Sequence, residues 1–249
     1  MRFFIAEDYK VHKTRILEFI SDFNQAGSAL DVNARNSIKL FELDNKTLNI
    51  KAFRKPNLIN RFAYRFFRKS KAERSFEYAG YLLKNNIGTP HPVAYAEELS
   101  AFQFLRSYYV SEHLDYNLTF RELDLNISGH KEILKAFSRF TFKLHENEVE
   151  FLDHSPGNTL IVLSEPEPKF YLVDLNRMNF RKLDFEARMK NFSRLTPKKE
   201  MVEVMASEYA KLIGRPETEV FEKMWFYTER FQYRFMRKHR WKKKLGLRK

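Results

Sequence analysis

Residues 148–177 of the chain read EVEFLDHSPGNTLIVLSEPEPKFYLVDLNR. In this stretch a short apolar run ends in Asp153, a turn follows, and Asn158 comes five residues after the aspartate. Two strand-like runs come next, and the second one leads into Asp174. Because strand ends joined by tight turns bring hard oxygen ligands close together, this pattern predicts a site for a metal ion and phosphate.

The spacing D-x-x-x-x-N, then a hairpin, then an Asp is typical of the catalytic and metal-binding loops of kinase-fold phosphotransferases. Asp153 is therefore predicted to orient the acceptor hydroxyl and take its proton, and Asn158 and Asp174 are predicted to bind Mg²⁺. The spacing is a weak signal when it stands alone, because Asp and Asn are common loop residues.

Two upstream residues complete the pattern. Lys51 lies on a predicted strand at 48–53 and could hold the α- and β-phosphates of ATP. Such a lysine needs a carboxylate partner, for which Glu77 on the predicted helix at 72–84 is preferred and Glu73, one turn earlier, is the alternative. In isolation these are an ordinary strand lysine and an ordinary helix surface charge. The order strand Lys, helix Glu, Asp–Asn turn, strand pair, Asp favours the kinase interpretation.

Hydrophobic periodicity predicts an α+β fold of two lobes, and the order of the motifs indicates the protein-kinase-like type. Residues 1–112 are predicted to form a nucleotide-binding N-lobe with an antiparallel sheet and one main helix. Residues 113–249 are predicted to form a mostly helical C-lobe with the catalytic and metal loops and a basic tail, the two lobes sharing one cleft. The predicted strands are 2–5, 37–43, 48–53, 93–96, 107–111, 159–163 and 170–173, and the predicted helices are 16–23, 72–84, 131–144, 198–212 and 218–240.

Composition excludes several classes of protein. The 249 residues are 43% hydrophobic, which argues against disorder. The absence of cysteine excludes a disulfide framework and a thiolate zinc site, and it favours a reducing, cytoplasmic setting. The N-terminus does not resemble a signal peptide, and no uncharged apolar run is long enough to span a bilayer.

The net charge of +13 is concentrated in two places. Residues 54–71 hold seven Lys/Arg and residues 230–249 hold ten, and neither stretch has an acid. The rest of the chain has 28 basic and 32 acidic residues, so a mildly acidic body carries two basic patches. Such patches suit a polyanion, whether anionic membrane, lipopolysaccharide phosphate or nucleic acid, and the alternative is a solvated surface without function.

Aromatic residues lie among the cations of both patches, which favours a membrane interface where aromatics enter the headgroup region. The predicted contacts to membrane or acceptor are Arg61, Arg65, Arg68, Lys69 and Trp241.

Several motifs resemble the lipopolysaccharide kinase family of Kdo and heptose kinases, close to its Bacteroidetes-type members. They are DHSPGN at 153–158, VDLNRM at 173–178, ARNSIKLF at 34–41, NIKAF at 49–53, FEYAGYLLKNNIGTPHPVAY at 76–95 and NFSRL at 191–195. The resemblance implies ATP- and Mg²⁺-dependent phosphorylation of a sugar hydroxyl on lipid A-linked Kdo or core heptose. It also implies a Kdo-lipid A type acceptor and a peripheral position on the cytoplasmic face of the inner membrane. The catalytic constellation favours such a glycolipid over nucleic acid as the partner of the basic patches.

The chain departs from the family pattern in two segments. Phe151-Leu152 stands where the family often has a His that braces the loop before the catalytic Asp. The predicted phosphate-covering loop, residues 27–36, has one glycine, and Arg35 and Asn36 are its candidate nucleotide-binding residues. Two other functions remain open: a kinase of a protein or soluble small molecule, and a catalytically silent kinase-like module that binds membrane or RNA.

Overall fold

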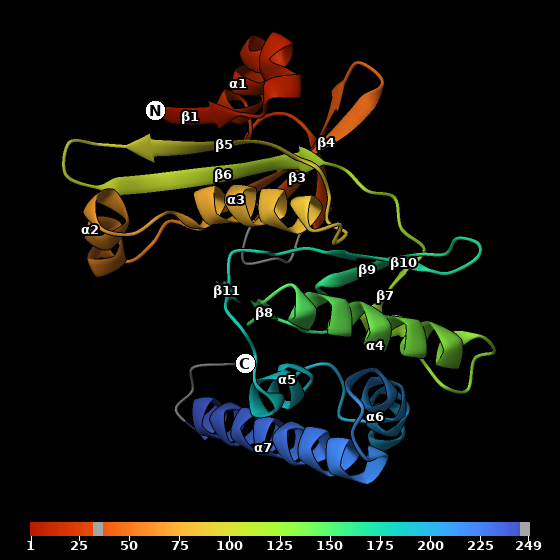
Figure 1. The fold of residues 1–249 in the computed structure, drawn as a ribbon. Coiled ribbons are helices and arrows are strands. Elements are labelled where there is room, and N and C mark those ends of the chain that lie inside the picture. The colour runs from red at the N-terminus through yellow and green to blue at the C-terminus, as the bar shows by residue number, and fades with distance from the viewer. Residues whose placement is uncertain (32–36, 245–249) are drawn as a thin grey trace. The chain divides into compact units, whose positions relative to one another are not determined.

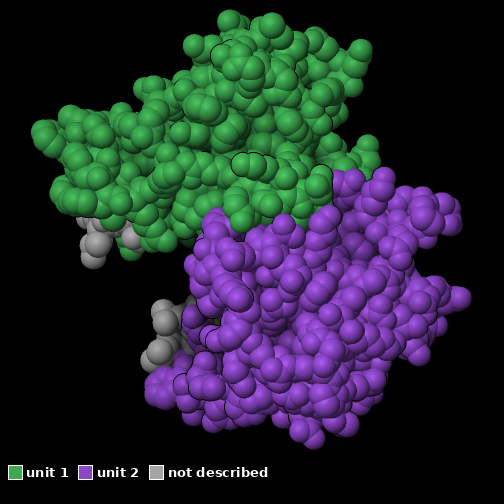
Figure 2. Space-filling view, viewed as in Figure 1, with its two compact units in different colours: residues 1–115, 174–176 green, residues 116–173, 177–249 purple. Residues whose placement is uncertain are grey.

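The computed structural model describes residues 1–31 and 37–244. The chain divides into two compact units, which Figure 2 shows in different colours. Unit 1 contains residues 1–115 and 174–176, and unit 2 contains residues 116–173 and 177–249. The short segment that begins at Asp174 therefore belongs to unit 1, although its neighbours in sequence belong to unit 2.

Unit 1 is built on a six-stranded antiparallel sheet with the strand order β1-β5-β6-β4-β3-β2 (Figure 1). Its strands are β1 (Arg2–Ile5), β2 (Ser28–Asp31), β3 (Ser37–Leu43), β4 (Lys46–Phe53), β5 (Pro92–Leu99) and β6 (Phe104–Glu112). The hairpin predicted from the sequence is present as β3 and β4, and its turn includes Asp44 at a φ of 52°. Aspartate is one of the few residues that adopt this left-handed conformation readily.

The alternation of side chains on β4 decides where Lys51 points. Leu48, Ile50 and Ala52 are buried in the core beneath α1 (Lys13–Ser21), which a 3₁₀ helix (Glu7–His12) precedes. Because successive side chains on a strand point to opposite faces, Lys51 lies on the other face of the sheet.

Helix α3 (Lys71–Lys84) packs against the Lys51 face of the sheet (Figure 1). Ser70 caps its N-terminus by accepting a hydrogen bond from the Glu73 backbone N–H. The Phe76 ring lies 5.7 Å from that of Tyr95 on β5. A short helix, α2 (Leu58–Phe66), precedes α3 and was not expected from the sequence.

Unit 2 is mostly helical. Its helices are α4 (His130–Glu146), α5 (Phe185–Asn191), α6 (Lys199–Ile213) and α7 (Glu217–Lys244), with a 3₁₀ helix (Phe120–Glu122). Its short antiparallel strands are β7 (Leu118–Thr119), β8 (Val149–Phe151), β9 (Thr159–Val162), β10 (Lys169–Leu172) and β11 (Met178–Phe180). The core contains fully buried Phe137, Met205 and Tyr209. No helix in the described part of the chain has the length and apolar character needed to cross a membrane.

Candidate active site

The Asp153 loop connects β8 to β9 and is tied down at several backbone atoms. The Leu152 N–H donates to the Arg177 carbonyl oxygen at 3.0 Å, and the Asn158 Nδ2 donates to the Asp153 carbonyl oxygen at 2.8 Å. The buried Asn191 side chain donates to the Phe151 carbonyl oxygen at 2.9 Å. These contacts fix the loop backbone, while the Asp153 side chain keeps 21% of its surface exposed.

The β9–β10 hairpin lies between the two predicted metal ligands in the sequence, with Asn158 directly before β9 and Asp174 two residues after β10. The Val173 N–H donates to the Asn158 carbonyl oxygen at 3.0 Å, and Asp174 is the residue after Val173. The Asn158 Nδ2 donates to the Asp153 carbonyl oxygen, and this bond leaves the amide oxygen Oδ1 as the atom that could bind a metal. Amide and carboxylate oxygens are ligands that Mg²⁺ prefers, so the donor types fit this ion.

The backbone of Asp174 is in the left-handed region, with φ at 60°. Its Oδ1 accepts hydrogen bonds from the Lys51 Nζ at 2.8 Å and from the Asn176 Nδ2 at 2.7 Å. The Lys51 Nζ also lies 5.4 Å from the centre of the Phe53 ring. The structure therefore pairs Lys51 with a carboxylate, and that carboxylate is the one predicted to bind metal.

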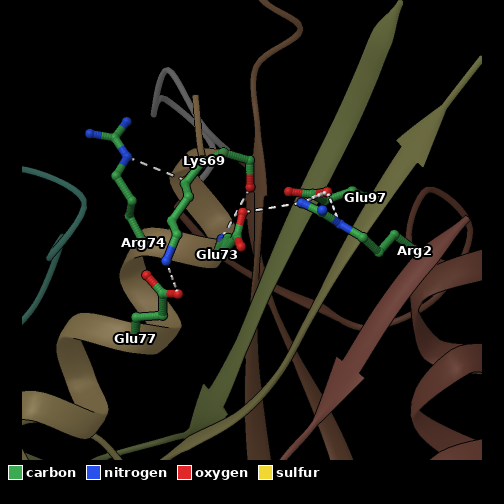
Figure 3. Close-up of polar contacts among 7 residues, drawn as sticks. Arg2, Lys69, Glu73, Arg74, Glu77 and Glu97 are labelled. Carbon is green, nitrogen blue, oxygen red and sulfur yellow. Dashed lines mark hydrogen bonds and ion pairs between the residues drawn. The ribbon is translucent and has the colours of Figure 1, made fainter. Parts of the chain in front are cut away.

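Neither glutamate of α3 contacts Lys51 among the described residues. Glu77 pairs with Lys69, and Glu73 Oε2 lies 3.1 Å from Arg2 Nη2, as Figure 3 shows. Arg2 also donates to buried Glu97 at 2.7 Å. The side chain of Glu73 is 13% exposed and that of Glu77 is 40% exposed. Burial raises the pKa of the Glu73 carboxyl, and the nearby Arg2 opposes this effect.

The predicted basic contacts of unit 1 lie on or just after α2. The Arg61 Nε donates to the Pro56 carbonyl oxygen at 3.0 Å, and the Arg65 Nε donates to the Ser100 carbonyl oxygen at 3.3 Å. The Arg68 guanidinium lies 5.7 Å from the Tyr64 ring centre. Lys69, which pairs with Glu77, is the fourth.

Two other sets of predicted residues lie elsewhere. Trp241 is 64% exposed on α7, in unit 2. Arg35 and Asn36 lie outside the described residues, so the phosphate-covering loop stays a prediction.

Sequence reasoning missed the residue that contacts the Asp153 carboxylate. Arg194 Nη2 lies 2.7 Å from Asp153 Oδ1, and its Nη1 donates to the Leu152 carbonyl oxygen at 3.0 Å. The available signal was the NFSRL motif at 191–195, which contains both Arg194 and the loop-binding Asn191. The sequence of this motif does not indicate which loop its side chains contact.

Two histidines are buried next to the Asp153 loop. The His145 Nδ1 is 2.6 Å from the Tyr209 hydroxyl, and its Nε2 is 3.2 Å from Asn191 Oδ1. The His154 ring packs between those of Phe137 and Phe151. Burial lowers the pKa of His154 to about 4 and that of His145 to about 3, so both rings are neutral at pH 7.

Comparison with solved structures defines the fold class. A structure described as "WaaP in complex with acyl carrier protein" matches with a TM-score of 0.64 and 17% identity, covering 94% of this chain and 99% of that chain. The Rio2 kinase–ADP/Mg²⁺–phosphoaspartate complex from Chaetomium thermophilum gives a TM-score of 0.48 and 14% identity, covering 87% of this chain and 67% of that chain. The WaaP match, which covers nearly all of both chains, confirms the predicted α+β, kinase-like fold.

The family follows from the sequence comparison. Residues 36–214 match the lipopolysaccharide kinase (Kdo/WaaP) family, and the chain belongs to this family. It is therefore a kinase, a phosphotransferase. The search of curated proteins gave no match.

Proposed function

We propose that this protein transfers the γ-phosphoryl group of ATP to a sugar hydroxyl, on Kdo or heptose, of a lipid A-linked lipopolysaccharide precursor. Family membership supports the reaction class. The Asp153 loop is the observation that carries the proposal, because its backbone is held at several atoms while its carboxylate reaches solvent. A general base needs a carboxylate that is both fixed and accessible.

In this reaction the acceptor hydroxyl gives its proton to Asp153 as its oxygen bonds to the γ-phosphorus. The bond from the γ-phosphorus to the β–γ bridging oxygen breaks, and its electron pair leaves with ADP. Mg²⁺ supplies charge neutralisation at the phosphate oxygens. Asn158 and Asp174 are the residues proposed to hold it.

Lys51 is proposed to bind the α- and β-phosphates of ATP. Its ammonium pairs with the carboxylate of Asp174. This contact supports the proposal, because it places the ammonium outside the sheet and beside an anionic oxygen. Glu77 stays the proposed carboxylate partner of Lys51 and Glu73 the alternative. Arg35 and Asn36 are proposed to contact the nucleotide.

The α2 surface, defined as Arg61, Phe62, Arg65, Phe66, Phe67, Arg68 and Lys69, is proposed to bind the anionic inner membrane that carries the acceptor. Phe62 is 55% exposed, Phe66 48% and Phe67 80%, although large apolar side chains are usually buried. Exposed aromatics among cations suit the boundary between lipid headgroups and acyl chains. Trp241 on α7 is proposed to anchor in the same membrane, on its cytoplasmic face.

A protein partner is the second candidate for this surface, because the similar WaaP structure contains acyl carrier protein. We propose acyl carrier protein as the partner to be tested on the α2 surface. Its binding would be measured in the same assays as the vesicles.

The phosphotransfer proposal is tested with labelled ATP, Mg²⁺ and Kdo-lipid A, beside an Asp153→Ala variant. Transfer by the wild type is expected to fall about 10²- to 10⁴-fold in the variant. Undiminished transfer would exclude Asp153 as the base. If the wild type transfers phosphate to a protein or a soluble sugar but not to any glycolipid, the acceptor assignment is wrong.

The membrane proposal is tested by sedimentation with anionic vesicles. The triple variant Arg61→Ala/Arg65→Ala/Arg68→Ala is expected to bind about 100-fold more weakly, since each cation near an anionic surface contributes about 1 kcal/mol. The matched control, Lys10→Ala/Lys13→Ala/Arg15→Ala, removes the same charge from the exposed side of the α1 region. Equal loss in both variants would show a general charge effect and contradict a dedicated surface.

A further inference from the structure

Arg194 reaches the Asp153 loop from a short turn. The turn follows α5 and lies between the buried side chains of Phe192 and Leu195. Because both neighbours are anchored in the core of unit 2, the backbone that carries Arg194 is fixed. The position of its guanidinium is therefore set by the fold of the unit.

The guanidinium has contacts on several sides. Its Nη1 donates to the Leu152 carbonyl oxygen, and its Nη2 forms an ion pair with Asp153 Oδ1. Its carbon Cζ lies 5.5 Å from the centre of the Phe231 ring on α7. The planar fork of arginine directs its N–H groups in fixed directions, whereas an ammonium group is a rotatable point charge that sets orientation less strictly.

The ion pair occupies one oxygen of the predicted base. It uses Asp153 Oδ1, and no described residue is hydrogen-bonded to Oδ2. The carboxylate is thus oriented by Oδ1 and keeps a second oxygen for another group. The arginine also holds the carbonyl oxygen of Leu152, the residue directly before Asp153.

We propose that Arg194 is a positioning residue for phosphoryl transfer. It holds the Asp153 carboxylate by Oδ1 so that Oδ2 receives the proton of the acceptor hydroxyl, and it braces the loop through the Leu152 carbonyl oxygen. This inference rests on the proposed function. It assigns a role to the Arg194–Phe231 contact as well, because the ring limits the movement of the guanidinium.

The first test separates positioning from substrate binding. Arg194→Ala is expected to lower kcat about 100-fold with KM for ATP and acceptor unchanged within about twofold, since a small misplacement of a reacting group costs that much. Arg194→Lys is expected to recover only part of the loss. The control is Arg215→Ala, which removes an exposed arginine that lies between α6 and α7 and pairs with Glu219 of α7, and it should leave kcat unchanged.

Rescue of activity by added methylguanidine is a readout that distinguishes positioning from a purely structural role. Methylguanidine is expected to restore part of the activity of Arg194→Ala and none of that of Asp153→Ala. A rise in acceptor KM with unchanged kcat would overturn the proposal, because it would make Arg194 a binder of the acceptor's anionic group. Activity equal to wild type in Arg194→Ala would overturn it as well.

The second test does not depend on the acceptor. In ¹⁵N NMR of the full chain, slow rotation about the guanidinium bonds of Arg194 is expected in the wild type and faster rotation in Asp153→Asn. Fast rotation already in the wild type would overturn the inference, even if no glycolipid is phosphorylated. Absent transfer by a wild type with a slow Arg194 signal would instead count against the proposed function alone. If Arg194→Ala fails to fold, Arg194→Lys and this measurement still decide the matter.

Discussion

Asp153 and Asp174 are both held by a cation that lies over a phenylalanine ring, yet the two arrangements differ. Arg194 contacts the Asp153 carboxylate and the adjacent backbone, and it is 5.5 Å from Phe231. Lys51 contacts Asp174 through one ammonium and is 5.4 Å from Phe53.

An arginine fork with two acceptors fixes orientation, whereas a lysine ammonium is a point charge that can move between anions. The difference suits the roles proposed for the two aspartates: Asp153 as a base that must keep its direction, and Asp174 as a metal ligand that must exchange its partner. Each prediction below tests one side of this comparison.

The largest effect is expected from Asp174→Asn. Asparagine tolerates the positive φ and can still accept a hydrogen bond from Lys51, so the substitution removes the charge while keeping the shape. Activity is expected to fall about 10³-fold, as for the loss of a strong transition-state contact. The control is Asp44→Asn, another aspartate at positive φ, on the exposed β3–β4 turn, which should retain activity. Similar losses in both variants would attribute the effect to the backbone.

A smaller loss is expected from Lys51→Met. A hydrogen bond to a charged group contributes about 1.5–3 kcal/mol, so kcat/KM for ATP should fall about 10- to 100-fold. Lys46→Met is the control, because Lys46 is on the same strand but points to the opposite face, where it pairs with Glu112. If kcat/KM for ATP is unchanged in Lys51→Met, the lysine serves only to pair with Asp174.

The Asp153 loop, unlike the Asp174 segment, contains a buried neutral imidazole, that of His154. This group makes the free energy of unfolding depend on pH. The folded pKa of His154 is about 4, below the ordinary value of 6.5, so the unfolded chain binds a proton more readily between these values. The stabilisation is present above about pH 6.5 and is lost as the pH falls toward 4.

At pH 5 the loss from His154 is about 2 kcal/mol in the free energy of unfolding. The substitution His154→Phe, which removes the ionisable group, is expected to reduce the fall in unfolding free energy between pH 7 and pH 5 by this amount. Urea titrations at the two pH values measure it. If the free energy of unfolding falls as much in the variant as in the wild type, another group causes the acid sensitivity. Buried His145 is the next candidate.

The smallest effect is expected from Phe231→Leu. A cation–π contact contributes about 0.5–1 kcal/mol, so kcat should fall about two- to fivefold as Arg194 becomes less restrained. Phe226→Leu, elsewhere on α7 and 51% exposed, is the control and should leave kcat unchanged. In Arg194→Ala the Phe231 substitution should have no further effect, because coupled residues are not additive. If the effects of the two substitutions on kcat are fully additive, Phe231 of α7 does not act on Asp153 through Arg194.

The sequence predicted the features that depend on local patterns. The β3–β4 hairpin followed from two alternating runs around a polar turn, and the kinase-like fold followed from the order of motifs. Helix α2 was missed because its aromatic residues are not buried in a core: Phe62 and Phe66 on the helix and Phe67 directly after it are 48–80% exposed.

The partners of the charged residues could not be predicted, because they lie far apart in sequence. Arg194 is 41 residues from Asp153, and Lys51 is 123 residues from Asp174. Hydrophobic periodicity carries no information about such pairs. For Glu77, its place on α3 was predicted, but its contact with Lys69 depends on how the chain turns before the helix.

The left-handed backbone of Asp174 restricts how this position can change over evolutionary time. At a φ of 60°, asparagine and glycine are the residues that replace aspartate with little strain, whereas branched side chains are strongly disfavoured. Asparagine is also one nucleotide away from aspartate in the genetic code. A descendant that abandons catalysis while keeping its fold is therefore expected to carry asparagine at this position, so that a single codon would distinguish silent relatives from active ones.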